Sequence, residues 1–132
     1  MNRPKLSIII PAYNEEKFIE QTLLSLANQV NSNGQPVDDR CFQIIIVNNA
    51  STDNTVEIVN NFISKNKNIL CHIIDQNTKS VVLSRITGYN YVINNPDFTT
   101  ELLASGDSDV CFHPLWVNTV LNKFNEEKCD II

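Results

Sequence analysis

Two carboxylates separated by one residue, Asp107 and Asp109, are the clearest candidates for chemistry in this sequence of 132 residues. They follow an apolar run and a Ser-Gly pair in the stretch Glu101–Pro114 (ELLASGDSDVCFHP). In an extended chain both aspartates point to one side, where their like charges repel unless a cation lies between them. Hard divalent cations accept such oxygens and take further ligands from water and phosphate. Aspartates are also common in surface turns, so the pair indicates a metal site mainly through its place after a strand.

The composition excludes several classes of partner. The formal net charge is −5 and the lysines and arginines do not cluster, so a basic face for nucleic acid is not expected. The apolar runs are far shorter than the roughly 18 to 20 residues of a transmembrane helix. The N-terminus enters a strand-like run directly, without the features of a signal peptide. We therefore expect one cytoplasmic domain with no transmembrane segment and no nucleic-acid partner.

The cysteines are scattered and form no C-x-x-C motif, so we expect reduced thiols with structural roles. A zinc site is the alternative, built from Cys71, His72, Cys111 and His113. Its ligands would have to come from separate strand ends without the spacing of a zinc knuckle, which disfavours it.

Apolar, β-branched segments alternate with helix-like segments along the chain. We expect buried strands at Leu6–Ile10, Phe42–Val47, Ile69–Ile74 and around Leu102–Ala104, with Asp130–Ile132 as the start of a fifth. The third helix is expected at Val81–Ile93.

Local signals mark where some of these elements begin and end. Pro11 is expected to end the first strand, and Asn14 to cap the helix that follows it. Pro114 fits the first turn of the fourth helix.

Regular strand–helix alternation predicts an α/β fold: a Rossmann-like, mostly parallel sheet with helices on both faces. In such sheets ligands bind beyond the carboxyl ends of the strands. The segments expected at that edge are rich in polar residues. They are Pro11–Glu15, Asn48–Asp53, Asp75–Lys79 and Asp107–His113. We expect three stretches, Pro11–Glu15, Asn48–Asp53 and Asp107–Asp109, to converge on one open cleft.

The order of these motifs resembles that of nucleotide-sugar-dependent glycosyltransferases of the GT-A type, specifically family 2. The matching pieces span nearly the whole chain: Ser7–Gln29, Ile44–Val59, the R-x-x-G of Arg85–Gly88, and Asp107–Val117. The resemblance implies that residues 1–132 are the nucleotide-sugar-binding half of a truncated GT-A domain. It places the acceptor-binding half and the catalytic base beyond Ile132, so no catalytic residue is expected in this chain, and the fragment alone is expected to be inactive.

The resemblance also implies roles for individual residues. Those expected to bind the nucleotide are Pro11, Ala12, Tyr13, Glu15, Asn49, Arg85 and Asp107. Tyr13 is expected near the base, Arg85 near the diphosphate and Asp107 near the ribose and sugar. Asp109 is expected to be the direct ligand of Mn²⁺ or Mg²⁺.

Two departures from the family pattern concern the nucleotide. Asn49 stands where the family usually has an aspartate that accepts a hydrogen bond from the base. An amide accepts but also donates, which leaves the base preference open. Lys79 and Ser80 replace glycines often found before the R-x-x-G, so the loop near the diphosphate is expected to differ.

The expected reaction is an inverting displacement at the sugar anomeric carbon, assisted by the metal. The donor is expected to be uridine-linked and the acceptor a carbohydrate or a lipid-linked sugar, which leaves open an association of the full-length protein with a membrane. A non-catalytic nucleotide-binding module of the same fold is the main alternative. A phosphohydrolase is disfavoured, because its acids belong after the first strand and Cys111 occupies the position of its threonine or valine.

Overall fold

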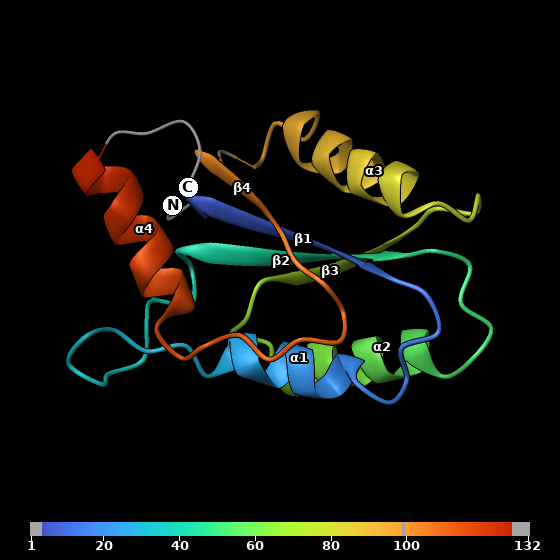
Figure 1. The fold of residues 1–132 in the computed structure, drawn as a ribbon, viewed down its shortest axis with the longest axis horizontal. Coiled ribbons are helices and arrows are strands. Elements are labelled where there is room, and N and C mark those ends of the chain that lie inside the picture. Colours follow the sequence, from blue (N-terminus) through green and yellow to red (C-terminus); the bar gives the residue numbers. More distant parts are fainter. Residues whose placement is uncertain (1–3, 99, 128–132) are drawn as a thin grey trace.

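The computed structural model describes residues 4–98 and 100–127 (Figure 1). Strands and helices alternate in the order β1 (Leu6–Ala12), α1 (Ile19–Ala27), β2 (Phe42–Asn48), α2 (Thr55–Lys65), β3 (Cys71–Asp75), α3 (Val81–Ile93), β4 (Leu102–Ser105) and α4 (Trp116–Glu127). The fifth strand expected at Asp130–Ile132 lies outside the described residues.

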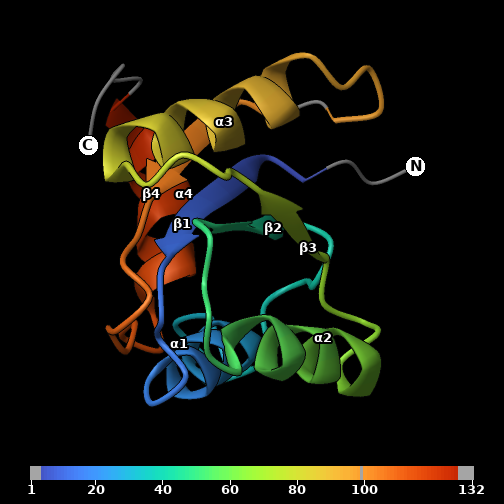
Figure 2. The ribbon, with the colours of Figure 1, turned by 90° about the vertical axis from the view of Figure 1, so that its right-hand side faces the viewer.

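The strands form one parallel sheet in the order β3-β2-β1-β4. Helix α3 covers one face, whereas α1 and α2 cover the other, and Val117 of α4 belongs to the same apolar cluster as those two helices (Figure 2). The predicted α/β architecture, a parallel sheet with helices on both faces, is therefore confirmed. No helix in the two described ranges is long and apolar enough to cross a membrane.

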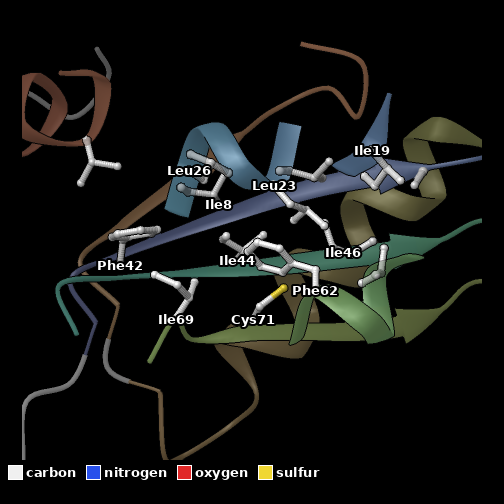
Figure 3. Packing of buried hydrophobic residues seen from close by; sticks show 14 of the residues in the cluster. Ile8, Ile19, Leu23, Leu26, Phe42, Ile44, Ile46, Phe62, Ile69 and Cys71 are labelled. Carbon is white, nitrogen blue, oxygen red and sulfur yellow. The ribbon is translucent and has the colours of Figure 1, made fainter. Parts of the chain in front are cut away.

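Alternation along the two central strands divides their apolar side chains between the two faces. Ile8 of β1 and Ile44 of β2 point toward α1 and α2, where they meet Leu23 and Phe62 (Figure 3). The next residue of β1, Ile9, belongs to a smaller cluster on the face covered by α3. Both central strands are thus buried on both faces. The loops that follow them emerge from a rigid part of the sheet.

Two local expectations for the first strand and helix are wrong. Pro11 does not end β1, because the pairing with β2 continues through Pro11 and Val47 to Ala12 and Asn48. Asn14 does not cap α1, which begins only at Ile19.

The remaining boundaries differ less. β3 begins at Cys71 and not at Ile69, and α4 begins at Trp116, after Pro114. Helix α3 spans the predicted Val81–Ile93.

Candidate functional site

A cleft of about 390 Å³ opens beyond the carboxyl ends of β1, β2 and β4. It is lined by Pro11, Ala12, Tyr13, Glu15, Asn49, Val81, Arg85, Asp107, Ser108 and Asp109. All eight residues for which the sequence predicts a role in nucleotide or metal binding therefore lie in one cleft. Val81 and Ser108 were not predicted, although the position of Ser108 between the two aspartates was a signal for it.

Hydrogen bonds between two loops hold the β1 side of the cleft. Asn14 has a left-handed backbone (φ 50°), a conformation that asparagine tolerates better than most residues. Its side-chain oxygen accepts a hydrogen bond from the Thr52 N–H at 2.8 Å, and the Glu15 N–H donates to Thr55 Oγ1 at 2.9 Å. The β2–α2 loop thereby positions Tyr13 and Glu15, which flank Asn14.

Asp53 completes this connection from the β2–α2 side. Its carboxylate accepts from the Thr55 N–H at 3.0 Å and from the Glu16 N–H at 3.3 Å. Desolvation opposes the charge of Asp53, but hydrogen bonds from Thr55 and Glu16 outweigh that effect and lower the pKa of the carboxyl. Asp53 thus binds the first residue of α2 and the loop after β1. It is not part of the cleft lining.

The acidic pair lies in a turn beyond β4, not in the strand itself. Asp107 and Asp109 are exposed, whereas Ser108 between them is buried and its carbonyl accepts from Thr22 Oγ1 of α1 at 3.0 Å. The anchored serine leaves both carboxylates facing solvent within the cleft lining.

Arg85 joins α3 to the end of β4. Its Nη1 donates to Ser105 Oγ, and its Nη2 lies 3.1 Å from Asp107 Oδ1. The ion pair is partly exposed to solvent, at 30% for the Arg85 side chain and 66% for that of Asp107. Exposed pairs contribute little to stability, typically about 0 to 1 kcal/mol, so Arg85 can exchange Asp107 for another anion at small cost.

The surroundings of Glu15 disfavour the charged form of its carboxyl. Desolvation raises the pKa of its carboxyl, and the charges of Asp109 and Asp53 raise it further, while a hydrogen bond with Ser108 opposes them. The cleft therefore concentrates negative charge around Glu15 and Asp109, and a cation bound there would relieve their repulsion.

Asn49 is buried, and its amide is bonded to the β3–α3 loop. Nδ2 donates to the carbonyls of Gln76 (2.8 Å) and Thr78 (2.7 Å), and Oδ1 accepts from the Ser80 N–H (2.9 Å). Both amide hydrogens are used, so toward a ligand in the cleft the side chain offers only the second lone pair of Oδ1.

The donor atoms of the cleft suit a hard divalent cation that is shared with a ligand. Asp107 and Asp109 present carboxylate oxygens, the ligands that such ions prefer. Within residues 4–98 and 100–127, no group of three or more His, Cys, Asp or Glu side chains is arranged to hold a metal. The remaining ligands would therefore have to come from water or from a phosphate.

The alternative zinc site has no support in the fold. Cys71 and His72 lie on β3, whereas Cys111 and His113 follow β4, and these are the two edge strands of the sheet. Burial also raises the pKa of the Cys71 thiol to about 12, which disfavours the thiolate that zinc requires.

The parallel α/β sheet with an acidic, loop-built cleft at its carboxyl edge agrees with the architecture expected of a GT-A glycosyltransferase domain. The sequence profile described as "Glycosyl transferase family 2" matches residues 7–132. The chain belongs to glycosyltransferase family 2, as the motifs predicted.

Comparison with curated proteins agrees with this family. "Glycosyltransferase GlyA" of Streptococcus pneumoniae is 30% identical over 127 residues, which cover 96% of this chain and 16% of the pneumococcal protein. An "Uncharacterized glycosyltransferase" of Haemophilus influenzae is 39% identical over 69 residues, covering 52% of this chain and 24% of that protein. The chain thus spans less than a quarter of the length of either relative.

Solved structures show the same fold at low sequence identity. Staphylococcus aureus TarS (residues 1–349, in complex with UDP) superposes with a TM-score of 0.72 at 23% identity, covering 96% of this chain and 33% of that one. The mannosyltransferase PcManGT of Pyrobaculum calidifontis, in complex with GDP-Man and Mn²⁺, gives a TM-score of 0.64 at 23% identity, covering 81% and 28%.

Proposed function

We propose that this chain is the donor-binding part of a glycosyltransferase that transfers a sugar from a nucleotide diphosphate to a carbohydrate or lipid-linked acceptor. The observation that carries the proposal is the single cleft, whose lining contains every residue that the family resemblance assigns to nucleotide or metal. In this proposal residues 1–132 bind the donor and supply neither the acceptor site nor the catalytic base. A cytoplasmic location stays a prediction from the sequence.

The base lies between Tyr13 and Asn49 in this proposal. Tyr13 offers an aromatic face in the cleft wall. Asn49 can only accept a hydrogen bond there, because Gln76 and Thr78 occupy both of its amide hydrogens. An acceptor suits the ring N–H of uracil, and equally that of guanine, but not the unprotonated ring nitrogen of cytosine. Uridine diphosphate is the ligand that we favour. TarS has a higher TM-score than PcManGT, and its structures are described in complex with UDP and with UDP-GlcNAc.

The diphosphate lies over the turn that follows β4. Asp109 would hold the divalent cation, and Asp107 would face the ribose or the water around the ion. When bound, the cation offsets negative charge that develops on the leaving diphosphate. Arg85 reaches the diphosphate by leaving its exposed contact with Asp107. Mn²⁺ is the ion of choice for a test, since the related mannosyltransferase structure is described with it.

A non-catalytic nucleotide-binding module remains the second candidate. It shares the cleft and the fold, because fold alone does not determine activity. The two differ in what the full-length protein does: only a transferase releases uridine diphosphate from a sugar donor when an acceptor is present.

Titration calorimetry of the 132-residue chain with uridine diphosphate, with and without Mn²⁺, tests the proposed site. We expect each ligand to raise the affinity of the other by the same factor, because they share coordination. Asp109→Asn should abolish this coupling, whereas Asp97→Asn, an exposed aspartate outside the cleft lining, should leave it intact. Equal nucleotide affinity with and without the ion would refute Asp109 as the metal ligand.

A further inference from the structure

Lys79 contacts Tyr13 at the rim of the cleft. Its Nζ donates a hydrogen bond to the Tyr13 hydroxyl at 2.8 Å and lies 4.5 Å from the centre of the tyrosine ring. The two residues are 66 positions apart in the chain, on the loops that follow β3 and β1. The contact therefore joins two loops at the mouth of the cleft.

The backbone on both sides of this contact is held in place. On one side, Asn49 binds the loop before and after Lys79 through the Thr78 carbonyl and the Ser80 N–H. Ser80 in turn caps α3, its Oγ accepting from the Leu83 N–H at 3.1 Å. On the other side, Asn14, the residue after Tyr13, is bonded to Thr52. The backbone next to Lys79 and the backbone next to Tyr13 are therefore both held by hydrogen bonds.

Tyr13 needs such a contact if it is to form a rigid wall. Its side chain is 44% exposed, and an exposed side chain loses rotational freedom when a ligand packs on it. A cation at the hydroxyl edge of the ring limits that freedom before the ligand arrives. Cation–π contacts at exposed sites contribute about 0.5 to 1 kcal/mol, so the expected effect is modest but measurable.

We propose that Lys79 is a positioning residue that preorganises the Tyr13 ring for stacking against the base of a nucleotide. The inference rests on the proposed function and adds to it a determinant of nucleotide affinity. Lys79 acts through Tyr13, so it should affect every ligand that carries the base and none that lacks it.

Calorimetry of the 132-residue chain with three ligands tests this: uridine monophosphate, uridine diphosphate with Mn²⁺, and inorganic pyrophosphate with Mn²⁺. Lys79→Met should weaken both nucleotides by the same factor, roughly two- to five-fold, and leave pyrophosphate unchanged. Lys79→Arg should restore most of the loss, because a guanidinium also donates hydrogen bonds to a hydroxyl and stacks on aromatic rings. Lys67→Met, which removes an exposed lysine from the α2–β3 loop, is the matched control for net charge.

A Tyr13→Leu background tests whether the effect passes through the ring. There, Lys79→Met should cause no further loss of nucleotide affinity. A loss confined to the diphosphate ligands, or one that persists in Tyr13→Leu, would show that Lys79 binds phosphate directly and would overturn the proposal. Unchanged nucleotide affinity in Lys79→Met would overturn the proposed role of Lys79 but leave the proposed function standing. Failure of the unmutated chain to bind uridine diphosphate overturns the proposed function and this inference with it.

Discussion

Asn49 is buried directly after β2, and both polar atoms of its side chain are bonded to the loop between β3 and α3. An aspartate there would keep the bond from the Ser80 N–H. It would lose both bonds to the carbonyls of Gln76 and Thr78 and would place a negative charge against their oxygens. The shape of this loop therefore favours the amide at position 49, whatever the ligand.

Asn49→Asp should lower the free energy of unfolding by about 1 to 3 kcal/mol, the usual cost of leaving buried hydrogen-bonding groups unpaired. Denaturant titration at neutral pH measures this. Asn77→Asp is the matched control, since it adds the same charge to an exposed position of the same loop. Equal stability of the two variants would show that the amide of Asn49 does not hold the loop.

Residues that line the cleft could be predicted from the sequence, but their bonding could not. The segments that contain Tyr13, Asn49 and Asp107 were expected together because polar residues that follow apolar strands gather at one edge of a parallel sheet. The family resemblance then singled out these three residues. The partners of Asn49 are backbone carbonyls, which carry no sequence signal and depend on the path of a loop. Val81 was missed for a related reason, because an apolar residue at a helix start has no chemistry to mark it.

Helix α3 approaches the sheet closely at Gly88. A Cβ atom at this position would lie 2.4 Å from Ile9 Cγ2 and 3.1 Å from Val47 Cγ2. Glycine in a helix costs up to about 1 kcal/mol relative to alanine. The close packing against β1 and β2 compensates for that cost. It also sets the distance of Arg85, one turn earlier on the same helix, from the end of β4.

Gly88→Ala should destabilise the chain by about 1 to 3 kcal/mol, because overpacking a buried contact outweighs the gain in helix propensity. Chemical denaturation gives the value, and a double-mutant cycle with Ile9→Ala identifies the cause. Removing the Ile9 γ-carbons eliminates the shortest contact and leaves only the one with Val47, so Gly88→Ala should cost less in that background. An equal cost in both backgrounds would rule out the contact with Ile9 as the source.

Elements with local start signals could be predicted better than those fixed by distant contacts. Helix α3 matches its prediction, and its cap, Ser80, is adjacent in sequence. The predicted start of α1 was wrong, because Asn14, a good capping residue, is bonded to Thr52 of another loop and not to the helix. Similarly, Pro11 was expected to end β1, but pairing with β2 on one side extends the strand by two residues.

At the scale of the molecule, His72 links β3, α3 and the loop before β4. It lies on the edge strand β3, and its ring is 6.2 Å from that of Tyr91 in α3 and 5.4 Å from that of Phe98 in the loop before β4. Burial in this aromatic group lowers the pKa of His72 from 6.5, since the charged ring is poorly solvated there. The folded state thus favours the neutral imidazole.

This preference makes stability depend on pH. Below about pH 6.5 the unfolded chain binds a proton that the folded chain resists, so the free energy of unfolding should fall as the pH decreases from 7 to 5. His72→Phe keeps a ring against Tyr91 and Phe98 but cannot be protonated, so its stability should change less over the same range. Glu15, with a raised pKa, titrates in the opposite sense in both proteins, so the comparison between them isolates His72. Parallel pH profiles for His72→Phe and the unmutated chain would mean that the imidazole is hydrated in the folded state, and that the aromatic group does not exclude water from this edge of the sheet.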